Sequence, residues 1–140
     1  MNIINILQSD MSDNLYNIKS VLDFTDEELA ILFDITVEEV KSVCNEKRDF
    51  RDEKKECCFN TETAAILMLD SIGDDERLIG YIKELYNRYH LNNTLLSKLT
   101  KVSVCAIEEL FANPQSISIE IKYKLCIKVV YLLFLFLQRN

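Results

Sequence analysis

The residues that most often perform catalysis or bind metals are sparse in this sequence of 140 residues. It has one histidine, His90, and five cysteines, of which Cys57 and Cys58 are adjacent. Structural zinc sites use spaced pairs such as Cys-x-x-Cys, and the sequence contains no such pair. It also lacks a glycine-rich phosphate loop and a carboxylate pair that stands out from its general acidity. We therefore predict a protein that is not an enzyme, with reduced thiols and neither metal nor cofactor.

Lysine and arginine, which bind phosphate groups, are distributed unevenly. The whole chain has a net charge of −7. Residues 1–76 hold 7 basic and 19 acidic residues, a net charge of −12, whereas residues 77–140 hold 9 basic and 4 acidic residues, a net charge of +5. Because a basic surface attracts nucleic acid and an acidic surface repels it, the two parts are expected to have different partners. We predict an acidic domain at 1–76 and a basic domain at 77–140.

The elements that must position these charges are helices. The chain contains only 2 glycines and 1 proline, too few for a fold rich in turns, and 49% of its residues are apolar. The pattern is clearest between residues 91 and 130, where it predicts two short helices and a third that follows. The residues that define the first two faces and the turn between them are Leu95, Leu96, Leu99, Val102, Ser103, Ile107, Leu110 and Phe111.

Two capping boxes predict the same arrangement in the first half. Thr25 precedes Glu28 by three residues and Thr36 precedes Glu39 by three, so one helix is expected after each threonine. Leu29, Leu32 and Phe33 are expected to face inward from the first of them, and Val40 and Val43 from the second. The charged run at residues 48–59 is expected to be a loop or an exposed helix start. A further helix, capped by Asn60 or Thr61 and ended by Gly73 and the two aspartates after it, is expected to follow.

The two halves match at a constant offset of 67 residues, which indicates an internal repeat. The matching pairs are Leu29 and Leu96, Leu32 and Leu99, Ile35 and Val102, Thr36 and Ser103, Val37 and Val104, Val40 and Ile107, and Val43 and Leu110. The predicted architecture is all-α, with two tandem helix-turn-helix-like units that share a helical core and a long apolar C-terminal helix.

Both ends of the chain are apolar. Residues 1–9 are expected to form a strand-like arm or a first turn. The C-terminal helix is expected to begin near Ser118, and residues 129–137 are nine apolar residues that leave it no polar face. A membrane span needs ~20 apolar residues, and three lysines interrupt this helix, so we predict no membrane span. We predict that residues 129–137 are buried between the units or against a second copy, as in a homodimer.

A known family has a similar pattern in the second half. The matching residues are Val102, Ser103, Ile107, Leu110, Asn113, Pro114, Ile117, Ser118, Glu120, Lys124 and Leu125. This spacing resembles the DNA-binding headpiece of lac-repressor-type regulators and, more loosely, lambda-repressor and Cro-like helix-turn-helix domains. The resemblance covers about the last third of the chain, and the first half is similar to the same family more weakly.

The resemblance implies a transcription regulator that contacts double-stranded DNA mainly through its second unit. The odd number of cysteines and the absence of a CxxC pair predict a cytoplasmic protein. It places Val104, Cys105 and Glu109 against base edges and Ser103 and Ala106 nearest the phosphates. The expected phosphate contacts are Lys98, Lys101, Lys122, Lys124 and Lys128. Glu109 and Lys101 depart from the family pattern, in which a polar or basic residue and a small residue, often glycine, occupy these positions.

A second interpretation assigns the protein to another class. A helix-turn-helix scaffold with an acidic first half is also suited to an inhibitor or adaptor that binds a basic surface of a protein partner. The residues expected to contact such a partner are Glu38, Glu39, Lys41, Lys47 and Arg48. Direct DNA contact by the first half is disfavoured, because Glu38 and Glu39 begin its second predicted helix.

Overall fold

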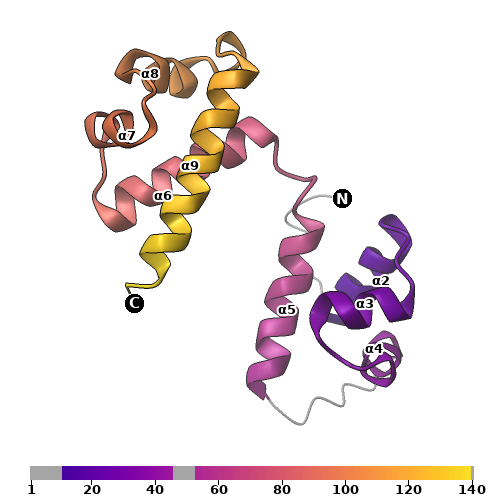
Figure 1. Ribbon diagram of the computed structural model, residues 1–140. Helices are drawn as coiled ribbons and strands as arrows, with labels where there is room; N and C mark the ends of the chain where they lie inside the picture. Colours follow the sequence, from indigo (N-terminus) through magenta and orange to yellow (C-terminus); the bar gives the residue numbers. More distant parts are fainter. Residues whose placement is uncertain (1–10, 46–52, 140) are drawn as a thin grey trace. The chain divides into compact units, whose positions relative to one another are not determined.

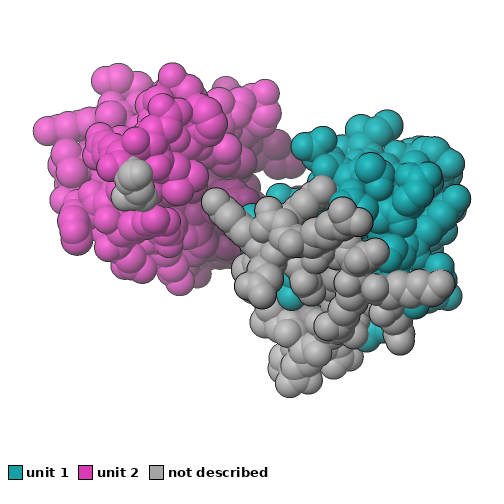
Figure 2. All heavy atoms as spheres, turned by 90° about the horizontal axis from the view of Figure 1, so that it is seen from below, with its two compact units in different colours: residues 1–72 teal, residues 73–140 magenta. Residues whose placement is uncertain are grey.

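A computed structural model describes residues 11–45 and 53–139, and every regular element among them is a helix (Figure 1). The predicted all-α class is therefore confirmed. The chain divides into two compact units, which are residues 1–72 (unit 1) and residues 73–140 (unit 2) (Figure 2). The predicted N-terminal arm at residues 1–9 lies outside the described residues, as do Lys47 and Arg48.

Unit 1 consists of four described helices: α2 (Met11–Val21), α3 (Asp26–Phe33), α4 (Val37–Cys44) and α5 (Glu53–Leu67). Helix α2 packs against α4 and α5, and α3 packs against α4. The buried apolar residues of this unit are Leu15, Ile18, Leu29, Phe33, Val40, Val43 and Phe59. The rings of Phe33 and Phe59 meet edge to face with 4.9 Å between centroids, which joins α3 to α5.

Both capping boxes predicted in unit 1 are present. The Thr25 hydroxyl accepts from the Glu28 N–H at 3.2 Å while the Glu28 carboxylate accepts from the Thr25 N–H at 2.8 Å. Thr36 and Glu39 make the same pair of bonds at 3.1 and 2.8 Å. These bonds satisfy backbone donors that have no partner inside the helix, so they fix where α3 and α4 begin.

Two boundaries differ from the prediction. Helix α5 begins at Glu53, so Asn60 and Thr61 lie within it and do not cap it. Lysine and glutamate are good helix formers, and residues 53–59 of the charged run form the start of this helix. Helix α5 ends at Leu67, and Gly73 is the N-cap of the next helix, not a residue that ends the previous one.

Unit 2 contains α6 (Asp74–Tyr89), α7 (Asn93–Thr100), α8 (Val104–Ala112), a short 3₁₀ helix η1 (Pro114–Ser116) and α9 (Ile119–Leu137). Helix α9 crosses α6 and also packs against α7 (Figure 1). The buried apolar residues are Leu78, Ile82, Leu85, Leu96, Val102, Ile107, Leu110, Leu125 and Val129. No helix in the described part of the chain has the length and apolar character that crossing a membrane requires.

The buried residues form two clusters, one in each unit, where the sequence predicted one shared core. The reason is that the short amphipathic helices of each unit bury their apolar stripes against one another. Leu32 and Leu99 were expected to face inward but are 44% and 49% exposed. An eight-residue helix presents little more than an i, i+4 pair to the core, and Leu29 with Phe33, and Leu96 with Thr100, occupy those positions.

Among the described residues, four non-glycine residues have a left-handed backbone, and each follows the C-terminal end of a helix. They are Asp23, Asp34, His90 and Lys101, with φ between 52° and 60°. Asp23 and His90 are 67 residues apart, as are Asp34 and Lys101, which is the offset of the predicted repeat. His90, the only histidine, therefore occupies the cap of α6.

Candidate nucleic-acid interface

The turn between α7 and α8 is short and held by hydrogen bonds at both of its ends. Helix α7 ends at Thr100, Lys101 takes the left-handed conformation, Val102 is buried and Ser103 is the N-cap of α8. The Ser103 hydroxyl accepts from the Ala106 N–H at 3.1 Å. This fixes the first turn of α8, the helix that the resemblance assigned to the major groove.

Thr100 supports the turn from inside the unit. Its side chain is fully buried, and its hydroxyl donates to the Leu96 carbonyl at 2.8 Å and accepts from the Val102 N–H at 3.3 Å. Both polar functions of the hydroxyl are thereby satisfied, so its burial is not penalised. Sequence reasoning did not identify Thr100, because a polar residue does not fit an apolar pattern. The 67-residue offset could have revealed it, since it relates Thr100 to Phe33, which was expected to face inward.

The start of α7 is fixed by Asn92 and Asn93, which the sequence reasoning also missed. The Asn92 side chain accepts from the Leu95 N–H at 2.9 Å, and the Asn93 side chain accepts from the Tyr86 hydroxyl at 2.6 Å. Asparagine is among the best N-cap residues, so Asn92 could have been recognised from its position before the apolar run. Burial raises the pKa of Tyr86 to about 12, so its hydroxyl keeps the proton that it donates to Asn93 well above neutral pH.

Four of the five predicted phosphate-binding lysines gather around this turn. The Lys124 ammonium donates to the Lys101 carbonyl at 3.3 Å, and the Lys128 ammonium donates to the Thr100 carbonyl at 2.9 Å. Lys101 itself is exposed at the turn, and Lys98 is exposed one helical turn earlier on α7. An ammonium group has three N–H donors, so one bond to a carbonyl leaves two for a phosphate.

The fifth lysine, Lys122, is held elsewhere. Its ammonium forms a salt bridge with Asp75 at 2.9 Å, and the same carboxylate accepts from the Gln115 amide at 3.0 Å. This network ties the start of α9 and the segment before it to the first turn of α6. The structure therefore gives Lys122 a role within unit 2 that the sequence did not reveal.

The predicted base-reading positions differ in how they are presented. Cys105 is exposed with a free thiol, Val104 is half-buried, and the first turn of α8 contains no acidic residue. Glu109 is exposed, but its carboxylate accepts a hydrogen bond from the Ser116 hydroxyl at 2.7 Å. Glu109 therefore links α8 to η1, and this contact accounts for a carboxylate at a position where the family pattern has a polar or basic residue.

The corresponding turn of unit 1 has the opposite charge. It joins α3 to α4, and Asp34 takes the left-handed position that Lys101 has in unit 2. Helix α4 carries Glu38 and Glu39 in its first turn, of which Glu38 is exposed and Glu39 is used in the capping box. Lys41 is exposed in the middle of α4. The turn of unit 1 is therefore acidic where the turn of unit 2 is basic.

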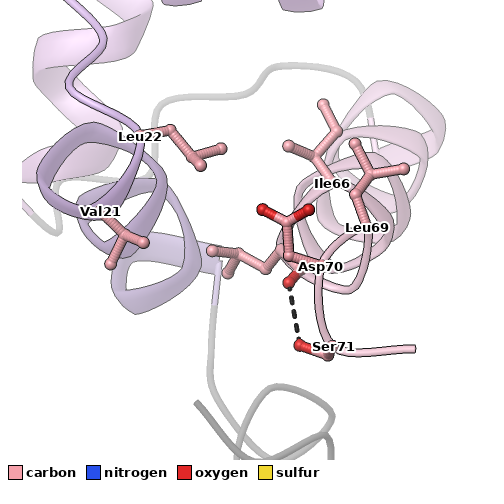
Figure 3. Close-up of a pocket in the computed structure, with 7 residues that line it drawn as sticks. Val21, Leu22, Ile66, Leu69, Asp70 and Ser71 are labelled. Carbon is pink, nitrogen blue, oxygen red and sulfur yellow. Dashed lines mark hydrogen bonds between the residues drawn. The ribbon is translucent and has the colours of Figure 1, made fainter. Parts of the chain in front are cut away.

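A pocket of about 250 Å³ lies in unit 1 between the C-terminal end of α2 and the residues around the end of α5. Leu22 and Ile66 point toward each other across it (Figure 3). The Ser71 hydroxyl donates to the Leu67 carbonyl at 3.3 Å, and this bond joins the residues after α5 to the last residue of the helix. The pocket is lined mainly by apolar side chains, with Asp70 and Ser71 as its polar residues.

Comparison with known proteins gave one result. A family model described as a helix-turn-helix domain matches residues 6–140. Searches of curated proteins and of solved structures found no match. The matched region contains both units and therefore includes the basic turn of unit 2 as well as the acidic turn of unit 1.

Proposed function

Because the chain belongs to the helix-turn-helix domain family, we propose that it is a cytoplasmic transcription regulator that binds duplex DNA through unit 2. The observation that carries this proposal is the gathering of Lys98, Lys101, Lys124 and Lys128 around the α7–α8 turn. The fold is a DNA-binding rather than a catalytic kind, and we propose no enzymatic activity.

In the proposed complex, the N-terminal end of α8 enters the major groove. Its backbone N–H groups carry partial positive charge, which favours the approach of phosphates on either side of the groove. Lys98 and Lys101 would contact phosphates directly, while Lys124 and Lys128 supply charge beside the turn. Cys105, the exposed side chain of the first turn, would then lie nearest the base edges together with Val104.

We further propose that the two units are copies of one motif and that only unit 2 contacts DNA. The 67-residue offset relates the two N-caps Thr36 and Ser103 and the two left-handed residues Asp34 and Lys101, which supports the first part. At that offset, Ile31 corresponds to Lys98 and Glu38 to Cys105. The DNA backbone would be repelled by the α3–α4 turn of unit 1 and attracted by the α7–α8 turn of unit 2.

The acidic turn of unit 1 favours a second candidate function. Asp34 and Glu38 are exposed on one turn, and Asp26, Glu27 and Glu28 occupy the first turn of α3. Such a surface suits a basic protein partner, so unit 1 would bind protein while unit 2 binds DNA. A pull-down with the full chain that recovers a basic protein, and loses it when Glu38 and Asp34 are changed to lysine, would support this function.

The DNA proposal is tested by the salt dependence of binding to a labelled duplex of mixed sequence. Changing Lys98→Gln together with Lys101→Gln removes two proposed phosphate contacts, so the slope of log K against log salt should become shallower by about 1.8. The same change should weaken binding about 30-fold at ~0.15 M salt. Lys41→Gln, which removes an exposed lysine from α4, is the matched control and should leave the slope unchanged. Equal effects from both variants, or no salt-sensitive binding by the wild type, would refute the proposal.

A further inference from the structure

Helix α9 has two apolar faces, and unit 2 covers only one of them. The covered face contains Leu125 and Val129, which are buried, and Leu132, Leu133 and Phe136, which pack against the core of the unit. On the opposite face the exposed apolar residues are Ile119, Tyr123, Ile127, Val130, Tyr131, Phe134, Leu135 and Leu137. Unit 2 alone therefore does not bury residues 129–137 on all sides.

The exposed face has the spacing of a coiled-coil seam. Tyr123, Ile127, Val130, Phe134 and Leu137 are separated by four, three, four and three residues in turn, and they are 45% to 67% exposed. Apolar residues that alternate at intervals of four and three form a stripe that packs against a second helix in a coiled coil. The helix is 19 residues long, or roughly 28 Å, so the seam extends over most of its length.

The exposed area is large enough for a stable pair. An aromatic side chain has ~150–250 Å² of surface, so Tyr123, Tyr131 and Phe134 together leave roughly 300 Å² exposed at their 60–67% exposure. The five aliphatic residues bring the patch to roughly 600 Å², which is at the upper end for a monomer. Two copies would bury about 1,200 Å², the lower limit of a standard specific interface.

The distribution of charge along α9 favours an antiparallel over a parallel pair of α9 helices from two copies. Glu120, Lys122, Lys124 and Lys128 all lie in its N-terminal half, and residues 129–137 carry no charge. In a parallel pair, Glu120 would face Glu120 of the second copy across the seam. The three lysines are turned toward unit 2, where they bond to Asp75, Lys101 and Thr100. In an antiparallel pair, each charged half faces a neutral half and the helix dipoles oppose, which is favourable.

We propose that the chain forms a homodimer through an antiparallel pair of α9 helices, in which Tyr123 of one copy packs against Phe134 of the other and Ile127 packs against Val130. This widens the predicted dimer segment from residues 129–137 to the seam at 123–137. It rests on the seam alone and holds whether or not unit 2 binds DNA.

The first test is the mass of the full chain in solution, measured by light scattering after size exclusion at several concentrations. The wild type should have twice the mass of one chain. Ile127→Lys places a charge in the middle of the seam and should give a monomer with unchanged helical circular dichroism. Ile31→Lys, which changes an apolar residue of α3 that is 83% exposed, is the matched control and should remain dimeric. A monomeric wild type, or dissociation by both variants, would overturn the proposal.

The second test determines the direction of the pair. Tyr123→Lys alone should dissociate the dimer, and adding Phe134→Glu to the same chain should restore it, because an antiparallel pair sets each lysine against a glutamate. In a parallel pair each lysine would face a lysine, so the doubly substituted chain would stay monomeric and the antiparallel arrangement would be refuted. A dimer that does not bind DNA would contradict only the proposed function, and a DNA-binding monomer would contradict only the dimer.

Discussion

Replacing Lys101 with glycine should stabilise unit 2, although it removes a residue in the middle of the proposed DNA-binding surface. Lys101 has φ of 60°, and the left-handed conformation costs an ordinary L-residue about 1–2 kcal/mol. Glycine adopts it without that cost but loses about 0.5–1 kcal/mol more backbone entropy on folding. The carbonyl that accepts from Lys124 is retained, so the net gain in the free energy of unfolding should be about 0.5–1 kcal/mol.

The matched control is the same substitution three residues earlier. Lys98 is exposed within α7, where glycine should lower the free energy of unfolding by about 1 kcal/mol. Urea unfolding followed by tyrosine fluorescence is the suitable assay, because the chain has no tryptophan and five of its six tyrosines lie in residues 73–140. The two variants should shift the unfolding midpoint in opposite directions. Equal destabilisation by both would show that Lys101 does not hold a left-handed conformation in solution.

Three further changes test the contacts that build unit 2. Ser103→Ala removes the acceptor for the Ala106 N–H and should lower the free energy of unfolding by about 1 kcal/mol in the same urea assay; no loss would mean that Ser103 does not cap α8. Asp75→Asn removes the salt bridge to Lys122 and should cost about 1 kcal/mol, less in high salt, whereas a loss independent of salt would argue against an ionic contribution. Burial raises the pKa of Tyr86 to about 12, so unfolded chains ionise first and stability should fall as pH rises from 10 to 12. The wild type should therefore lose more stability than Tyr86→Phe between about pH 10 and 12, and parallel losses would contradict the assignment.

Local rules allowed the starts of α3 and α4 to be predicted from the sequence. Thr25 with Glu28 and Thr36 with Glu39 interact over three residues, so the distance between partners is set by the backbone itself. Ile107 and Leu110 were likewise predicted as buried because a helical period places them on one face.

Contacts between residues far apart in the chain could not be predicted in this way. Lys124 and Lys128 reach carbonyls 23 and 28 residues earlier, and no sequence spacing indicates that α9 passes the end of α7. The bond between Glu109 and Ser116 depends on where η1 returns beside α8. The seam on α9 was hidden for a related reason, since a helix with two apolar faces reads in the sequence as one that is apolar all round.

The most direct test of DNA binding by unit 2 is the change in backbone amide resonances when a duplex is added to isotopically labelled full-length chain at low salt. The proposal predicts the largest changes at residues 101–106, which contain the basic turn and the start of α8. Residues 34–39, the same segment 67 positions earlier, serve as an internal reference and should change little. Changes centred on residues 34–39, or none at all, would contradict the proposal that unit 2 binds DNA.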